Sequence, residues 1–117
     1  MTGLRKSYGC PVEFSLDLLG GKWKMVILAR LKQNLMRYGE LRRAIPDLSD
    51  KVLTERLGGL REVGLVESLA DADGVTRYQL TARGESLRSV LQALYDWGEA
   101  EAATLKVSIR PPAPTSD

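Results

Sequence analysis

The feature that most constrains the fold is a close succession of short patterns between residues 36 and 80. An extended piece at 36–38 leads into a helical pattern at about 39–44, which Pro46 helps to end. The sequence IPDLSD at 45–50 then forms a turn, and a second helical pattern runs to about Val63. Two strand-like segments follow at once, joined by Asp73-Gly74, a tight-turn signal.

The second of these helices has local signals at both ends and a buried side. Ser49 is a favourable N-cap, and Gly64 suits the position just after the last turn. Apolar residues recur at helical spacing along one side, at Leu53, Leu57 and Leu60. Two short helices joined by a turn and followed by a hairpin predict a winged helix-turn-helix, in which such a helix buries one side and lays the other in the major groove of DNA.

Further helices are predicted on both sides of this unit. Residues 11–19 form a helix with Cys10 at the N-cap, Pro11 at the first position and Glu13 placed to reach back to the cap. A second, strongly apolar helix covers 22–33. After the hairpin, Thr81 caps a long helix over about 82–104.

The whole chain is expected to be one mainly α domain with a small β-hairpin wing. Residues 1–9 form a flexible arm, residues 10–104 form the winged helix-turn-helix and dimerisation domain, and residues 105–117 form a disordered tail. The homodimer would form through the terminal helices.

Composition excludes most kinds of catalytic site. The chain has no histidine and one cysteine, so histidine-based nucleophile systems, His-ligated metals and intrachain disulfides are impossible. No phosphate-binding glycine motif is present. We therefore expect no enzyme, no metal and no cofactor. The longest apolar run, at 25–29, is too short to cross a bilayer, and no secretion signal opens the chain, so we expect a cytoplasmic protein without membrane contact.

Charge is distributed unevenly along the chain. Residues 1–61 hold twelve Lys or Arg against six Asp or Glu, whereas residues 62–117 hold five against nine. The net charge of +2 therefore conceals a basic half and an acidic half. A basic half favours a surface that meets a polyanion.

The exposed side of the helix after Ser49 mixes hydrogen-bond donors with acceptors, as the base edges of the major groove do. Lys51 can donate to guanine, Thr54 can contact a thymine methyl or a phosphate, and Glu55 can accept from cytosine. A solvated helix face is the alternative, in which Ser49 only caps and Asp50 only complements the helix dipole. In this order of elements we assign the face to DNA reading, through Ser49, Asp50, Lys51, Thr54 and Glu55.

Three segments together resemble the HxlR-type transcriptional regulators, relatives of the MarR group. They are CPVEFSLDLLGGKWKMVIL at 10–28, YGELRRAIPDLSDKVLTERLGGLREVGLVE at 38–67, and RYQLTARGESL with DWGE between 77 and 99. The resemblance implies a homodimer of winged helices that represses or activates nearby genes by binding double-stranded DNA. It also implies that a cysteine near the first helix, here Cys10, often senses oxidants or electrophiles.

Two features depart from the family pattern. The wing sequence DADGVT is short and acidic, and phosphate repels acidic residues, which disfavours contact between the wing and DNA. Gly58 stands where relatives often carry a longer, frequently basic side chain. Gly58 and Gly59 are also unusual inside a helix, where each costs about 1 kcal/mol relative to alanine. Close approach of another helix or a ligand, or simple drift, would explain them.

Basic side chains outside the recognition helix are candidates for phosphate contacts, which fix register and set salt dependence. Ordinary surface cations are the alternative for each. The candidates are Lys22, Lys24, Arg42, Arg43 and Arg77.

The apolar stripe of the last helix exceeds what a small domain needs to cover. Part of it, with the first helix, is assigned to a two-fold interface; packing on the chain's own core is the alternative. The predicted interface comprises Leu87, Val90, Leu91, Leu94, Tyr95 and Trp97.

Cys10 is the one residue with reaction chemistry. Thiols at helix N-termini ionise more readily, and Arg5 or Lys6 would add to this effect. Oxidation, alkylation or a mixed disulfide would then follow. A small, unreactive helix cap is the alternative.

These features predict a dimeric, sequence-specific regulator on a pseudo-palindromic operator, with Cys10 as the candidate switch for an oxidant or electrophile. Two alternatives remain open. One is a winged-helix module that binds a protein partner through its hairpin and long helix. The other is a regulator switched by a small apolar inducer held at the dimer interface.

Overall fold

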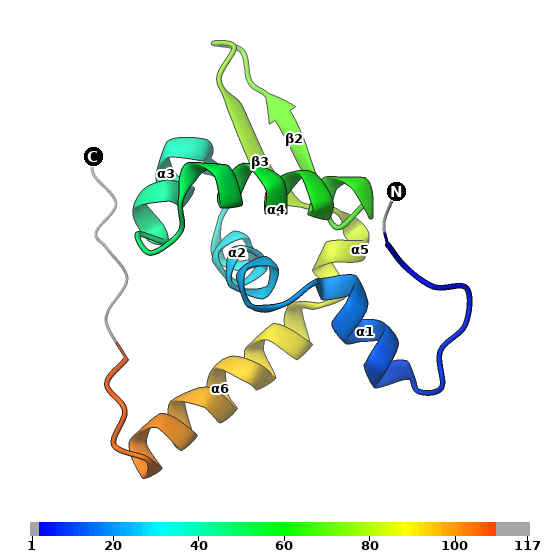
Figure 1. Cartoon of the computed structure of the whole chain (residues 1–117). Coiled ribbons are helices and arrows are strands. Elements are labelled where there is room, and N and C mark those ends of the chain that lie inside the picture. Colours follow the sequence, from blue (N-terminus) through cyan, green and yellow to red (C-terminus); the bar gives the residue numbers. More distant parts are fainter. Residues whose placement is uncertain (1–2, 110–117) are drawn as a thin grey trace.

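The computed structural model describes residues 3–109, so the predictions for residues 1–2 and 110–117 lie outside the described part of the chain. Within it the fold is mainly helical with a small antiparallel sheet, as predicted (Figure 1). The elements are α1 (Pro11–Leu19), α2 (Lys22–Gln33), β1 (Met36–Arg37), α3 (Tyr38–Ala44), α4 (Asp50–Glu62), β2 (Val66–Ala70), β3 (Thr76–Leu80), α5 (Ala82–Glu85) and α6 (Arg88–Thr104).

The core lies around α2, with α3 and α4 against one side of that helix and α6 against another (Figure 1). Ile27 and Leu28 of α2 are fully buried, as are Leu53 and Leu60 of α4. Burying a side chain of this size contributes about 1.5–3 kcal/mol. The stripe predicted on α4 is therefore what holds this helix to the domain. Of the described residues, none that is polar or charged is fully buried.

The wing is the end of a three-stranded sheet of order β1-β3-β2. Ser68 pairs with Tyr78 in the hairpin, and Met36 of β1 pairs with the same tyrosine from the other side. The extended piece before α3 is thus a strand of the wing's sheet. The turn is longer than the predicted Asp73-Gly74 pair, because Gly74 N donates to Asp71 O and Asp71 N donates to Val75 O.

The prediction of one long helix over 82–104 is wrong, because the chain breaks into α5 and α6. Thr81 caps α5 as expected, accepting from Gly84 N at 3.0 Å. Gly84 packs so closely on the end of the hairpin that a Cβ there would collide with the Leu65 carbonyl oxygen. Arg88, at the start of α6, donates to the Lys32 carbonyl at the end of α2. The break therefore lets α5 pack against the end of the hairpin while α6 forms a hydrogen bond with the end of α2.

The segment before α1 is tied to that helix. The Tyr8 hydroxyl donates to Asp17 at 2.9 Å and accepts from Arg5 N, and its ring lies edge-on to Phe14. Glu13 accepts from Gly9 N, one residue before the cap that we expected it to reach. These contacts join residues 5–9 to α1. Among residues 3–109, no helix combines the length and apolarity that a membrane span requires.

Candidate nucleic-acid interface

The side of α4 opposite its buried leucines is exposed along the helix. Lys51, Thr54, Glu55 and Gly58 are all exposed, while the leucines on the opposite side are buried. Ser49 caps the helix, since its Oγ accepts from Val52 N at 3.2 Å. One face of α4 therefore packs on the core and the opposite face is accessible to solvent, as is required of a helix that lies in a DNA groove.

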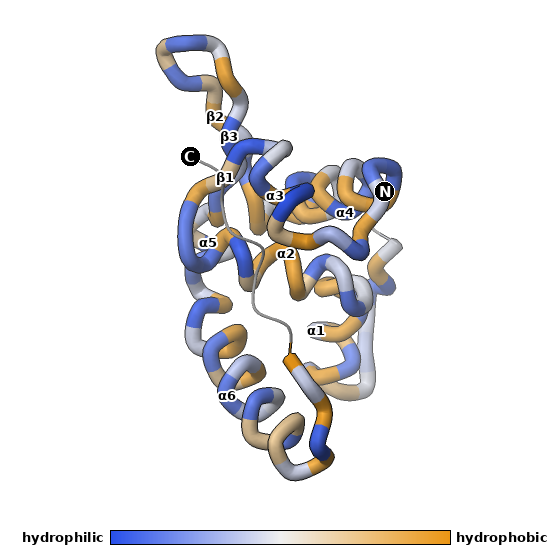
Figure 2. The backbone as a smooth tube through the Cα atoms, turned by 90° about the vertical axis from the view of Figure 1, so that its left-hand side faces the viewer, coloured by the Kyte–Doolittle hydropathy of each residue, from blue (hydrophilic) through white to orange (hydrophobic). Residues whose placement is uncertain are grey.

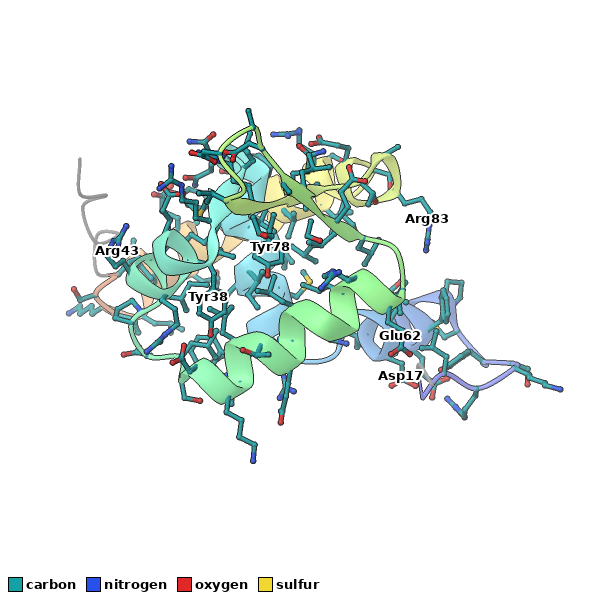
Figure 3. The ribbon with its side chains drawn as sticks, turned by 90° about the horizontal axis from the view of Figure 1, so that it is seen from above. Asp17, Tyr38, Arg43, Glu62, Tyr78 and Arg83 are labelled. Atoms are coloured by element: carbon teal, nitrogen blue, oxygen red, sulfur yellow. The ribbon has the colours of Figure 1, made fainter. Side chains whose placement is uncertain are left out.

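Tyr38, the first residue of α3, connects two of the predicted reading residues. Its hydroxyl lies 2.6 Å from Asp50 Oδ1 and 3.2 Å from Thr54 Oγ1. Figure 3 shows Tyr38 directed from α3 toward α4. The hydrogen bond to Asp50 raises the pKa of the Tyr38 phenol, because ionisation would place a phenolate against a carboxylate. Sequence reasoning missed this residue, although it opens the motif YGELRR.

Arg42 is engaged within the helix-turn-helix unit. Its Nε lies 3.1 Å from Asp50 Oδ1, and its Nη1 donates to the Leu48 carbonyl oxygen in the turn. The guanidinium therefore holds the turn and the start of α4 together. One carboxylate oxygen of Asp50 in turn accepts from Tyr38 and pairs with Arg42, so its charge has partners on the protein although the side chain is 75% exposed.

The other predicted phosphate contacts differ in their surroundings. Lys22 is exposed at the start of α2 and lies over the ring of Trp23, 4.4 Å from its centroid. Lys24 lies against α4, with its Nζ 2.9 Å from where a Cβ of Gly59 would be. Arg43 lies on the side of α3 away from α4 (Figure 3). Gly59 therefore makes room for the Lys24 side chain, whereas Gly58 faces open space.

Arg77, the second residue of β3 and thus close to the wing's turn, forms an ion pair with Asp71. The other carboxylate oxygen of Asp71 accepts from Val75 N, as does Asp73 Oδ1. Asp71 and Asp73 thus both stabilise the turn, and Asp71 also forms the ion pair with Arg77. The expected repulsion between wing and phosphate is partly offset by this pair, but Arg77 is less available to DNA.

A second exposed surface lies on α6, opposite the reading face. Val90, Leu94, Tyr95 and Trp97 are exposed, by 45% to 66%. The described chain after α6 returns beside this helix, where Ile109 lines a pocket with Leu94 and Tyr95 (Figure 2). Exposed apolar patches of this kind mark interaction sites. Two members of the predicted interface lie elsewhere in the subunit: Leu91 is buried in its core, and Leu87 packs against that core.

Helix α1 carries Cys10 and adds to the exposed apolar surface. Val12 and Leu16 are 63% and 68% exposed. Cys10 is exposed at the N-cap and its side chain makes no capping hydrogen bond. Arg5, expected to act on the thiol, instead pairs with Glu13 at 2.9 Å. In the described part of the chain, no group of His, Cys, Asp and Glu side chains is arranged to hold a metal ion.

Comparison with known proteins agrees with this architecture. The model of the HxlR-like helix-turn-helix family matches residues 18–105. The HTH-type transcriptional regulator YdzF of Bacillus subtilis (strain 168) is 38% identical over 104 residues, which cover 86% of this chain and 95% of YdzF.

Two solved structures are similar in both fold and sequence. The redox regulator HypR in its reduced form is 32% identical, with a TM-score of 0.74, over 85% of this chain and 100% of that one. Quinone-bound YodB from B. subtilis is 33% identical, with a TM-score of 0.65, over 78% and 99%. With a helix-turn-helix whose second helix is open to solvent and a hairpin wing beside it, this chain belongs to the HxlR-like helix-turn-helix family of transcriptional regulators, and it is not an enzyme.

Proposed function

We propose that this regulator binds a pseudo-palindromic operator as a homodimer and reads it with α4. The observation that carries the proposal is the division of α4 into a buried leucine side and an exposed polar side. The polar side offers an ammonium group at Lys51 and a carboxylate at Glu55, which match the acceptors of guanine and the donor of cytosine. Lys22 and Arg43 are the exposed cations that supply sequence-independent phosphate contacts.

The apolar surface of α6 supports the dimer. Leu94 and Trp97 stand on it with 49% and 66% of their surface exposed, where a lone subunit would leave them in water. Pairing two subunits through α6 and α1 would cover this surface. Two recognition helices related by a two-fold axis then address half-sites about one helical turn, roughly 34–36 Å, or a multiple apart.

The position of Cys10 supports a switch operated by an oxidant or electrophile. The thiol is exposed and lies on α1, which shares the apolar surface of the proposed dimer. Modification of Cys10 would change the relative orientation of the two subunits and hence the distance between their recognition helices. HypR is a redox regulator and YodB has been solved with a bound quinone, which favours this trigger.

Selection of bound sequences from random duplex DNA tests the proposal, because it reports both preference and half-site spacing. Paired, inverted half-sites are expected. In the selected operator, Lys51→Ala should weaken specific binding more than binding to random DNA, by about ten-fold or more in the ratio of the two. Equal losses on both duplexes would assign Lys51 to phosphate, and selection without any preference would contradict the proposed function.

A matched experiment tests the switch. Diamide or a quinone should change the operator affinity of the wild type and leave that of Cys10→Ser unchanged. The same response in both proteins would exclude the thiol as the trigger.

One specific observation favours a small apolar inducer as the second candidate trigger. A shallow apolar groove between α2 and α6 is lined by Met25, Val26, Ala29, Leu91, Leu94 and Tyr95. It opens onto the surface assigned to the dimer. If it holds an inducer, an apolar compound will alter operator affinity equally in wild type and Cys10→Ser.

A further inference from the structure

The hydroxyl of Tyr38 has a defined role in its hydrogen-bond network. It stands 2.6 Å from Asp50 Oδ1 and 3.2 Å from Thr54 Oγ1. A phenol has a single proton, and an ionised carboxylate only accepts, so Tyr38 donates to Asp50. Thr54 must then donate its own proton to Tyr38. This uses the only proton that Thr54 could offer to DNA.

That assignment removes one of the two contacts expected of Thr54. Phosphate oxygens only accept hydrogen bonds, so a threonine that already donates to Tyr38 has no proton for them. Its Oγ1 is held on the side of α4 that faces α3. The other heavy atom on Cβ is the methyl group, and Thr54 lies on the exposed face of the helix.

The next turn of α4 gives a base edge room to approach this methyl. Gly58 follows Thr54 by four residues, so the two lie on the same face of the helix. No atom of the residues that the structure describes, beyond the helix's own neighbouring backbone, lies within 4 Å of where a Cβ of Gly58 would be. A threonine methyl beside a bare backbone forms a small apolar notch, and the C5-methyl of thymine is the apolar group of the major groove.

We propose, on the basis of the proposed DNA-reading role of α4, that Tyr38 is a positioning residue which holds Thr54 Oγ1 toward α3, so that the Thr54 methyl and Gly58 receive a thymine methyl. Tyr38 touches no base itself. It also keeps Asp50 turned toward Arg42, so the carboxylate at the start of α4 stays away from the phosphates. Specificity at one base pair thus depends on a hydroxyl in the other helix of the unit.

Deoxyuridine tests the inference, because it differs from thymidine only by the C5-methyl. Each thymine of the selected operator half-site is replaced in turn. For the wild type, one position should lose about four-fold in affinity, the value expected for one buried methyl group. Thr54→Ser, which keeps the hydroxyl and lacks the methyl, should show no such loss. Thr54→Val has two methyl groups on Cβ, so a methyl is present whichever way the side chain turns, and this variant should show the same loss as the wild type.

The role of Tyr38 is tested by rescue. Tyr38→Phe frees the Thr54 hydroxyl, so the thymine-to-deoxyuridine ratio at that position should fall toward one. Adding Thr54→Val to Tyr38→Phe should restore the ratio, which a purely structural role of Tyr38 would not predict. Tyr78→Phe is the matched control, since the Tyr78 hydroxyl makes no hydrogen bond with the described residues, and it should leave the ratio unchanged.

The outcomes separate this inference from the function on which it rests. A wild type that selects an operator but is insensitive to deoxyuridine at every thymine would overturn the thymine contact. A ratio unchanged in Tyr38→Phe would overturn the positioning role. Absence of any selected operator would instead overturn the proposed function, and this inference with it.

Discussion

At the scale of single residues, the main finding is that polar groups expected to face DNA are partly engaged within the protein. Arg42 and Asp50 pair with each other, and so do Arg77 and Asp71. The residue types alone did not reveal these pairs, because each joins segments that only the turn or the wing brings together. Within residues 3–109, Lys51 and Glu55 have no such partner from another element, so other side chains affect their assignment to base contacts least.

Tyrosine titration tests the Tyr38–Asp50 hydrogen bond. Because the folded-state pKa of Tyr38 lies above the unfolded value of about 10, the bond contributes stability below pH 10 and loses it as pH rises through the folded pKa. Subtracting the tyrosinate absorbance curve of Tyr38→Phe from that of the wild type should leave a transition above pH 10. A difference curve centred at or below pH 10 would contradict the bond.

The Arg77–Asp71 pair makes a prediction about the wing. Asp71→Asn keeps the oxygen that accepts from Val75 N and removes the charge that holds Arg77. Affinity for random duplex DNA should rise several-fold, and the slope of log affinity against log salt should steepen by about one unit. Asp73→Asn removes an equal charge without freeing Arg77. If both variants leave the slope unchanged, the wing does not contact phosphate.

At the scale of the elements, packing decides where glycine is required. Gly58 lies in the middle of α4 facing open space, whereas Gly84 in α5 is pressed against the end of the hairpin. Both sit in helices and look alike in the sequence. Close approach, one of the explanations considered for the glycine pair, holds for Gly59 beside Lys24 and not for Gly58.

Alanine at these two positions should act in opposite directions on stability. Gly58→Ala should raise the free energy of unfolding by about 1 kcal/mol, the difference in helix propensity. Gly84→Ala should lower it by about 1–3 kcal/mol, because the added methyl displaces the Leu65 carbonyl or the helix itself. Urea denaturation followed by circular dichroism measures both. Destabilisation by Gly58→Ala would show that its surface is covered in solution.

At the scale of the whole molecule, α4, which carries the reading face, and α6, which carries the apolar surface, lie on opposite sides of α2 (Figure 1). This separation lets one surface pair subunits while the other meets DNA. Charge follows the same division, since the basic half of the chain contains α2, α3 and α4 and the acidic half contains α6.

Two leucines of similar exposure test the proposed dimer. Leu94 on α6 is 49% exposed and Leu69 on the wing is 45% exposed. Leu94→Glu should give a monomer in sedimentation velocity and weaken operator binding at least ten-fold, because burying an unpaired carboxylate opposes association. Leu69→Glu should leave the oligomeric state as it is. A wild-type monomer, or an unchanged Leu94→Glu dimer, would assign the α6 surface to another role.

The sequence by itself determined the order of elements, the buried side of α4, the Ser49 and Thr81 caps and the family to which the chain belongs. These follow from signals that act within a few residues, namely apolar spacing, capping hydroxyls and turn-forming residues. Only the tertiary structure decided that β1 joins the wing's sheet, that the last helix breaks after Glu85, and that Leu91 lies in the core. It also decided which polar groups stay available, since Tyr38, Arg42, Asp50 and Thr54 meet only once α3 and α4 have packed together.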